Sequence, residues 1–228
     1  MFEILLVDLD DTVLDFQGAE AVAIRKTLAD EGLEPTDSVC RRYSECNDLH
    51  WKMLERGEIT RDQVLVGRFQ MLFDEMGIKV DAAAVAKNYT ENLSRGYAML
   101  PGAEDALKAL QKKYRLFLAS NGTAWVQRRR IAGAKIEAYF EDIFISQEIG
   151  VNKPAKEYFD RCFARISGFA PEKTMIVGDS LSSDILGGQN AGIATCWVNP
   201  KGKACNLEKA PDHVIESISE LEALLETI

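Results

Sequence analysis

The feature that most constrains this chain is the segment ILLVDLDDT at residues 4–12, where an apolar run ends in a cluster of carboxylates. Its first four residues are all apolar, which is typical of a strand buried on both faces of a parallel sheet. Asp8, Asp10 and Asp11 follow that strand at once. Carboxylates at the end of a buried strand are unfavourable unless their charge is compensated. Because ligands of open α/β sheets bind at the carboxyl ends of strands, a bound cation is the simplest compensation.

The next stretch, residues 14–100, contains no convincing strand and predicts four helices. We expect them near 18–31, near 36–56, from Thr60 onward and from Asp81 onward. Thr60 and Gln63 form a capping-box pattern at the start of the third helix. One apolar stripe in that helix is predicted from Leu65, Phe69, Leu72 and Met76.

From residue 101 onward, strand and helix patterns alternate, which is typical of a doubly wound sheet. The expected strands are 115–120, 142–146, 173–179, 193–198 and 213–215. The expected helices are 103–113, 123–133, 155–168, 183–191 and 217–227. We therefore predict an α/β protein with a Rossmann-like, doubly wound, mainly parallel sheet and an inserted four-helix domain. The core would comprise 1–13 and 101–228, and the inserted domain 14–100.

Polar side chains that could converge follow four of the predicted strands. They are Asp8 and Asp10, then Ser120, Asn121 and Gly122, then Lys153, and finally Asp179 and Asp184. Carboxyl ends of parallel strands lie at one edge of a sheet. That edge would thus hold a carboxylate nucleophile, an acid/base, a hydroxyl, an ammonium group and metal-binding carboxylates.

Four short segments carry these residues: DLDDT, SNG, NKP and GDSLSSD. In this order they resemble the four motifs of the haloacid-dehalogenase superfamily of phosphohydrolases, and the helical insertion resembles that superfamily's α-helical cap. The segments RGEIT (56–60), GRF (67–69) and SDILGGQNAGIATCWVN (183–199) resemble the bacterial pyrimidine 5′-nucleotidase branch. The resemblance implies Mg²⁺-dependent hydrolysis of a small phosphorylated metabolite, with a nucleoside 5′-monophosphate, pyrimidine preferred, as the expected substrate. A cap that closes over the site would then select the leaving group.

The predicted reaction needs a nucleophile and an acid/base. Asp8 would attack phosphorus and form an aspartyl-phosphate. Strand alternation would place Asp10 on the same side as Asp8, where it could protonate the leaving alkoxide and then activate water. By resemblance, Mg²⁺ would be held by the Asp8 carboxylate, the Asp10 carbonyl and Asp179. Asp184 would either contact the groups around the metal or reach the metal through a water molecule. Mn²⁺ takes similar oxygen ligands and stays open as an alternative.

The phosphate group would be held mainly by the second and third segments. Ser120 and the backbone amides of Asn121 and Gly122 would bind a phosphate oxygen, and Lys153 would balance its charge. Thr12 is expected to bond the backbone of its turn, with a phosphate contact as the alternative.

Several neighbouring residues have simpler structural interpretations. Asp11 is expected to serve the turn, and the Asn121 side chain could cap the helix that follows. Gly187–Gly188 is expected to permit close packing, and residues 128–130, three consecutive arginines, to form a solvated face. Within the inserted domain, core packing is the main expectation for Tyr43, Trp51 and Phe69. Residues that could contact a base or sugar are Asn47, Arg56 and Arg68.

Other functions stay open. Asp10 argues against dehalogenation, because halide leaves without a proton and the dehalogenase branch, as the resemblance implies, lacks this aspartate. Phosphoglycolate or a sugar phosphate could replace the nucleotide as substrate, and a phosphomutase or a non-catalytic binding module are further alternatives. Two histidines without a suitable serine argue against a Ser–His–Asp triad or a zinc site.

Composition limits the partners. A net charge of −9 and a pI near 4.9 argue against a nucleic-acid polymer or an anionic membrane. There is no basic leader and no apolar run of about 18 residues, and none of the five cysteines forms a CxxC pair. We therefore expect a cytoplasmic protein with reduced thiols, while monomer and dimer stay equally open.

Overall fold

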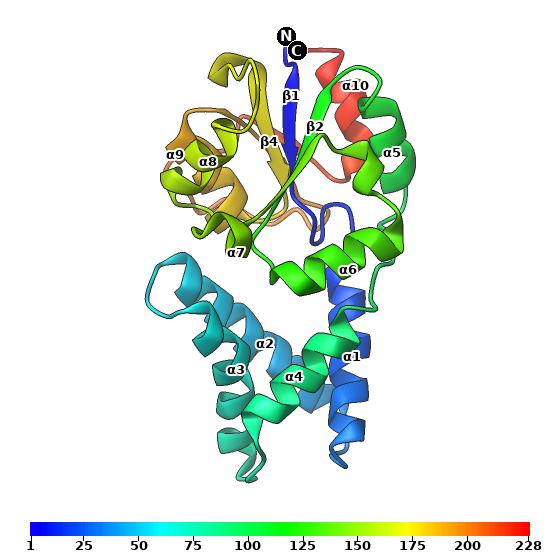
Figure 1. Cartoon of the computed structure of the whole chain (residues 1–228), viewed down its shortest axis with the longest axis vertical. Helices are drawn as coiled ribbons and strands as arrows, with labels where there is room; N and C mark the ends of the chain where they lie inside the picture. Colours follow the sequence, from blue (N-terminus) through cyan, green and yellow to red (C-terminus); the bar gives the residue numbers. More distant parts are fainter. The chain divides into compact units, whose positions relative to one another are not determined.

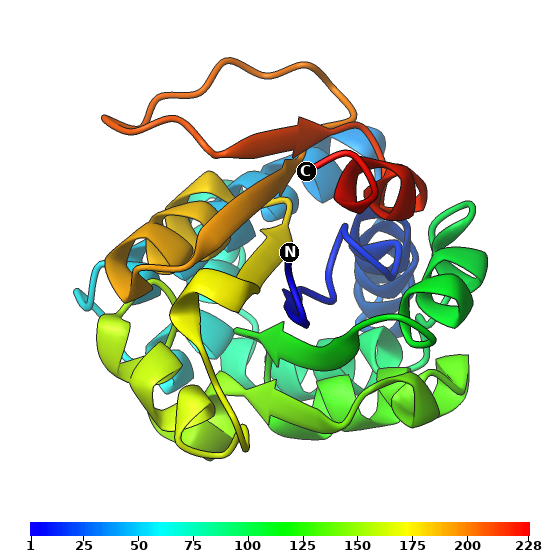
Figure 2. The same ribbon diagram turned by 90° about the horizontal axis from the view of Figure 1, so that it is seen from above.

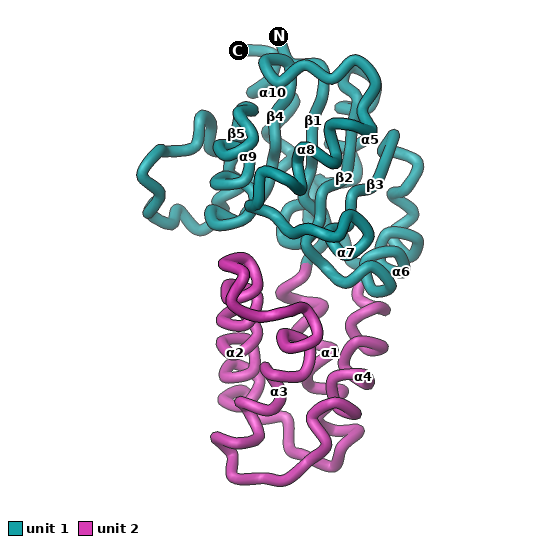
Figure 3. Tube along the Cα trace, turned by 60° about the vertical axis from the view of Figure 1, so that its left-hand side comes forward, with its two compact units in different colours: residues 1–15, 97–228 teal, residues 16–96 magenta.

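The computed structural model describes all 228 residues. The chain divides into two compact units, shown in teal and magenta in Figure 3. The first unit comprises Met1–Asp15 and Tyr97–Ile228, and the second comprises Phe16–Gly96. The boundaries expected from the sequence fall after residues 13 and 100, close to these.

The first unit is built on a six-stranded sheet with the order β3-β2-β1-β4-β5-β6 (Figure 1). All neighbouring strands pair in parallel, which confirms the predicted doubly wound, Rossmann-like class. The strands are β1 (Ile4–Val7), β2 (Arg115–Ser120), β3 (Asp142–Ile145), β4 (Thr174–Gly178), β5 (Ala194–Val198) and β6 (His213–Ile215). The acidic segment thus extends from a central strand, between β2 and β4.

Helices cover both faces of this sheet, as the view from above shows (Figure 2). Alternation along β1 sends Leu5 and Val7 into one apolar cluster with side chains of α5, α6 and α10, and Ile4 and Leu6 into another with α8. The helices are α5 (Ala103–Leu110), α6 (Ala124–Ala134), α7 (Ser146–Ile149), α8 (Lys156–Phe163), α9 (Leu186–Ala191) and α10 (Leu221–Leu225). Burial of β1 on both faces explains why its sequence is uniformly apolar.

Some of the predicted ends of helices and strands were wrong. The expected helix 155–168 stops at Phe163, and the expected terminal helix is a 3₁₀ turn, Ile218–Glu220, followed by α10. Ser146, assigned to a strand, begins the short helix α7. The predicted start of α9 is a π-helical turn, Leu181–Ile185.

The second unit consists of the four predicted helices. They are α1 (Phe16–Asp30), α2 (Asp37–Glu55), α3 (Arg61–Met76) and α4 (Ala82–Leu93). Thr60 and Gln63 form the predicted capping box, and Asp81 caps α4 by accepting from two backbone N–H groups. The predicted stripe of α3 is rotated: Phe69 and Leu72 are buried, but Met76 is exposed and Phe73 is buried in its place.

A buried polar chain crosses the core of this second unit. The Arg68 guanidinium lies 4.8 Å from the centroid of the Tyr89 ring and donates to Asn47 Oδ1 at 2.6 Å. Asn47 in turn donates to Glu20 Oε1 at 2.7 Å. Tyr43 and Phe69 pack around the same guanidinium, as expected of core aromatics. Asn47 and Arg68, which the sequence offered as base contacts, are therefore engaged in the packing of this unit.

All five cysteines are free, and four of them are buried. None of the helices combines the length and the apolar composition that a membrane crossing requires.

Candidate active site

The two catalytic candidates of the first motif lie in the loop after β1 and not within the strand. Asp8 continues the line of β1, and its N–H donates to Val177 O at 2.9 Å. Two residues on, Asp10 forms an isolated bridge with Leu14, and Asp11 adopts a left-handed conformation with φ of 54°. The alternation argument for Asp10 was therefore wrong, because the chain leaves the strand before this residue. The turn, in which Asp11 serves as predicted, directs the two carboxylates to different partners.

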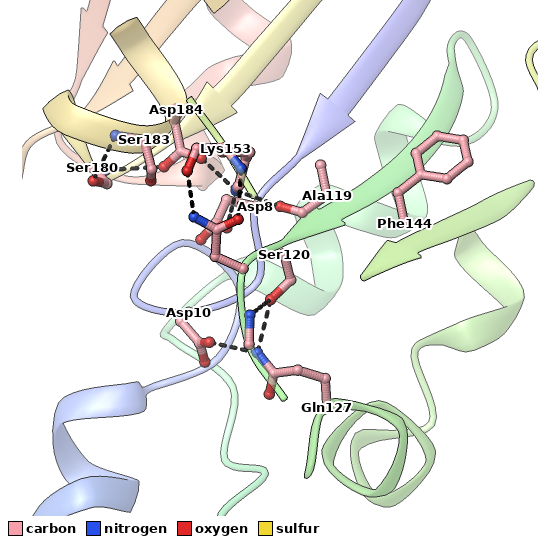
Figure 4. Close-up of polar contacts among 12 residues, drawn as sticks. Asp8, Asp10, Ala119, Ser120, Gln127, Phe144, Lys153, Ser180, Ser183 and Asp184 are labelled. Carbon is pink, nitrogen blue, oxygen red and sulfur yellow. Dashed lines mark hydrogen bonds and ion pairs between the residues drawn. The ribbon is translucent and has the colours of Figure 1, made fainter. Parts of the chain in front are cut away.

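Lys153 compensates the charge of Asp8. Only 1% of its side chain is exposed, and its Nζ donates to Asp8 Oδ1 at 2.8 Å, to Asp184 Oδ1 at 2.6 Å and to Ala119 O at 2.6 Å (Figure 4). Burial opposes the charged form of Lys153, but Asp184 and Asp8 outweigh it and raise its pKa. The lysine therefore stays protonated between two carboxylates.

Asp184 is completely buried, and the turn after β4 positions it. Its Oδ2 accepts from Ser180 N at 3.1 Å, and Ser180 Oγ accepts from Ser183 N at 3.2 Å. Gly178 leaves room for the carboxylate, because a Cβ there would lie 2.3 Å from Asp184 Oδ2. Asp184 thus lies beside the proposed metal ligands Asp8 and Asp179, and it is also a direct ionic partner of Lys153.

Three carboxylates of this site fit a hard divalent cation. Asp8, Asp179 and Asp184 each offer an oxygen, and these oxygens lie within 4.8 Å of one another. Burial, with a smaller contribution from neighbouring Asp184 and Asp10, raises the pKa of Asp8 to about 8 against the attraction of Lys153. Burial, together with the other carboxylates, also raises the pKa of Asp179 well above its ordinary value. A cation bound by these oxygens would offset both effects, and carboxylate oxygens are the ligands that Mg²⁺ prefers.

The second motif places a hydroxyl and an amide at the end of β2. Ser120 Oγ accepts from Gly122 N at 3.1 Å. Asn121 pairs with the backbone of Lys153 in both directions: its Nδ2 donates to Lys153 O at 2.9 Å, and its Oδ1 accepts from Lys153 N at 2.8 Å. The suggestion that Asn121 caps α6 was wrong, because Thr123 holds that position. Asn121 instead fixes the backbone that carries the lysine.

Two residues of α6 that the sequence reasoning missed contact Asp10. Arg130, expected on a solvated face, is fully buried, and its Nη1 donates to Asp10 Oδ1. Gln127 Nε2 donates to Asp10 Oδ2 at 2.6 Å and to Ser120 Oγ at 2.8 Å. The expectation holds for the other two arginines of this run, which are exposed. A usable signal was the helical spacing of Gln127, Arg130 and Ile131, which places all three on one face.

The remaining predictions about this loop and the glycine pair differ in outcome. Thr12 Oγ1 is buried without a hydrogen-bond partner, so the expected bond to the turn backbone is absent. Backbone bonds close that turn instead, including Val13 N to Leu9 O at 3.0 Å. Gly188 does permit close packing, since a Cβ there would lie 2.5 Å from Ile176 Cγ2.

Comparisons with known proteins agree with this architecture. The sequence model of the haloacid dehalogenase-like hydrolase family matches residues 5–198. The HAD-hydrolase YfnB of Bacillus subtilis is 39% identical over 224 residues, which cover 98% of this chain and 95% of YfnB. Pyrimidine 5′-nucleotidase PynA of Streptococcus pneumoniae is 35% identical over 221 residues, covering 96% of this chain and 93% of PynA. A crystal structure of YfnB bound to magnesium matches with a TM-score of 0.94 and covers 98% of each chain.

Proposed function

The chain belongs to the haloacid dehalogenase-like hydrolases and is a phosphoric monoester hydrolase, and on that premise we propose that it acts with Mg²⁺ through an aspartyl-phosphate on Asp8. The observation that supports this most strongly is the buried triad of Asp8, Lys153 and Asp184 beside Asp179. These groups gather at the carboxyl end of a parallel sheet, where ligands of such folds bind.

Each chemical step has a residue of this chain to perform it. In the first step an Asp8 oxygen attacks phosphorus, a new P–O bond forms, and the bond to the alkoxide leaving group breaks. Asp10 donates a proton to that alkoxide. In the second step Asp10 takes a proton from water, the water oxygen attacks phosphorus, and phosphate leaves Asp8. Lys153 donates to Asp8 and so favours its ionised form against the effect of burial, and it balances the charge of the phosphoryl group.

The metal would be held by the carboxylates of Asp8 and Asp179 and the backbone carbonyl of Asp10. When bound, Mg²⁺ supplies electrostatic stabilisation of the charged phosphoryl oxygens. Ser120 and the backbone amide of Asn121 would hold a phosphate oxygen, and the amide of Gly122, expected from the sequence to join them, donates to Ser120 Oγ in this structure.

We propose a pyrimidine nucleoside 5′-monophosphate as the substrate. Similarity to PynA over nearly the whole of both chains supports this choice. The helical unit would select the substrate, which is the role that the sequence predicted for residues 14–100. The alternative substrates are phosphoglycolate and a sugar phosphate, and the alternative reaction is phosphoryl transfer by a mutase. Each of these would use the same carboxylates.

The test is phosphate release from a panel of monoesters, each with Mg²⁺ and with EDTA. The panel contains UMP, dUMP, dTMP, CMP, AMP, GMP, phosphoglycolate and sugar phosphates. We expect EDTA-sensitive release that is greatest with the pyrimidine nucleotides. EDTA-sensitive activity that is greatest on another compound would change the substrate assignment and leave the proposed mechanism intact. Turnover by Asp8→Asn above a few per cent of wild type would exclude Asp8 as the nucleophile.

A further inference from the structure

The side-chain amide of Gln127 has one possible orientation. Its Oε1 accepts from Arg130 Nη1 at 3.0 Å, and a guanidinium can only donate. The Nε2 group must therefore face the opposite way, where its two hydrogens are donated to Asp10 Oδ2 at 2.6 Å and to Ser120 Oγ at 2.8 Å. Figure 4 shows Gln127 bridging these two groups. Because Gln127 and Arg130 are both buried, water does not compete for these bonds.

This arrangement determines what Ser120 can do. A hydroxyl oxygen has two acceptor positions and one hydrogen to donate. Gly122 N and Gln127 Nε2 occupy both acceptor positions. The Ser120 hydrogen is consequently left to donate, which is the role that binding a phosphate oxygen requires.

The same arrangement orients Asp10. Arg130 donates to Oδ1 and Gln127 donates to Oδ2, so both carboxylate oxygens are held from the side of α6. The Asp10 side chain is nevertheless 28% exposed, so part of the carboxylate stays accessible. A carboxylate held in this way keeps one rotamer, as a proton donor and acceptor of fixed position must.

We propose that Gln127, itself oriented by Arg130, is a positioning residue that couples the acid/base Asp10 to the phosphate-binding Ser120. Through one amide it fixes the position of the Asp10 carboxylate and leaves the Ser120 hydroxyl as a donor to the phosphate. The inference rests on the proposed function, because it assumes the roles of Asp10 and Ser120 given above.

Gly122 provides an independent indication. A Cβ at this position would lie 2.3 Å from Gln127 Nε2 and 2.5 Å from its Cδ, closer than real contacts allow. The glycine of the second motif therefore makes room for the Gln127 amide. Gly122→Ala should displace Gln127 without changing any of the hydrogen-bonding side chains.

The experiment compares two substrates whose leaving groups differ in their need for a proton. A nucleoside 5′-monophosphate releases an alkoxide, which needs one, and p-nitrophenyl phosphate releases a stable phenolate, which does not. In Gln127→Leu, which keeps the volume but not the hydrogen bonds, kcat/KM should fall about 100-fold for the nucleotide, at the lower end of what an acid/base contributes. For p-nitrophenyl phosphate the fall should stay within about tenfold, the effect of a weakened phosphate contact.

Three further variants separate positioning from packing. Gln127→Glu keeps the shape and the contact with Arg130 but cannot donate, so it should show the same selective loss as Gln127→Leu. Gly122→Ala should reproduce it with the glutamine present. Arg128→Ala, an exposed change on the same helix, is the matched control and should leave both substrates unaffected. Equal losses for the two substrates, within about threefold, would overturn the inference, because a packing defect lowers both alike.

Asp10→Asn in the same assay distinguishes this inference from the proposed function. It should show the largest difference between the two substrates. If it shows none, the acid role of Asp10 is wrong and the inference fails with it. If it shows the difference and Gln127→Leu does not, only the positioning role is excluded.

Discussion

Replacing Lys153 with methionine should destabilise the protein by about 3–5 kcal/mol without divalent metal, because two carboxylates lose their buried partner. Methionine retains most of the apolar stem, so the loss reports the charge and not the volume. Lys153 Nζ lies 2.8 Å from Asp8 Oδ1 and 2.6 Å from Asp184 Oδ1, and both carboxylates are buried. The lost hydrogen bond to Ala119 O accounts for about 1 kcal/mol of this destabilisation.

The destabilisation caused by Lys153→Met depends on pH. Without the ammonium group, a buried carboxyl in Lys153→Met keeps a proton that the unfolded chain releases. The folded state then binds more protons than the unfolded state, so stability falls as pH rises. We therefore expect the loss to be smaller at pH 5 than at pH 8.

The assay is urea unfolding in EDTA, with the free energy of unfolding extrapolated to water. The set comprises wild type, Lys153→Met, Asp184→Asn and the double variant, with Lys156→Met as the matched control. Lys156 is an exposed lysine of α8 paired with Asp160, so its loss should have little effect. The double variant should recover a coupling energy of about 1–3 kcal/mol. A change below 1 kcal/mol in Lys153→Met, or strict additivity in the double variant, would refute the reasoning.

Three further results are expected. Asp179→Ala should raise the Mg²⁺ concentration for half-maximal activity about tenfold or more; an unchanged MgCl₂ titration would move the metal site elsewhere. Without metal, the stability of wild type relative to Asp8→Asn should fall as pH rises from about 4 to about 8. Burial raises the pKa of Asp8 from 3.8 to about 8, so the folded state retains a proton that the unfolded state loses. A difference between the two urea midpoints that does not change with pH would contradict this. Gly188→Ala should lose about 1–3 kcal/mol of stability, since the new Cβ would lie 2.5 Å from Ile176 Cγ2 and 2.7 Å from Thr195 Cγ2; a urea midpoint equal to that of wild type would show that the sheet yields at this point.

The strands and the class of the sheet followed from local patterns, whereas the spatial order of the strands was not predicted. Apolar runs of strand length alternate with helical segments, and four of the runs are followed by polar residues at the carboxyl end. Lys153 was identifiable because it follows the third strand and precedes a proline. Helix ends were less predictable, as α8 illustrates, because the last turn depends on what packs against it.

The errors about Arg130 and Asn121 and the omission of Gln127 share one cause. Arg130 was expected to be exposed because of its charge, and Gln127 was not considered. Both contact Asp10, which is more than a hundred residues away in the chain. Asn121 was taken as a helix cap because its sequence neighbours form a helix, but its partner is the backbone of Lys153. In each case the deciding contact joins distant segments.

The sequence by itself determined the class of fold, the helical insertion and the set of groups at the sheet edge, because hydrophobic periodicity and strand-end polarity are local properties. Only the tertiary structure decided which of those groups bond to one another. It paired Lys153 with Asp8 and Asp184, and it assigned Asp10 to Gln127 and Arg130. Buried polar groups must find partners wherever the fold brings them, and no local pattern specifies that choice.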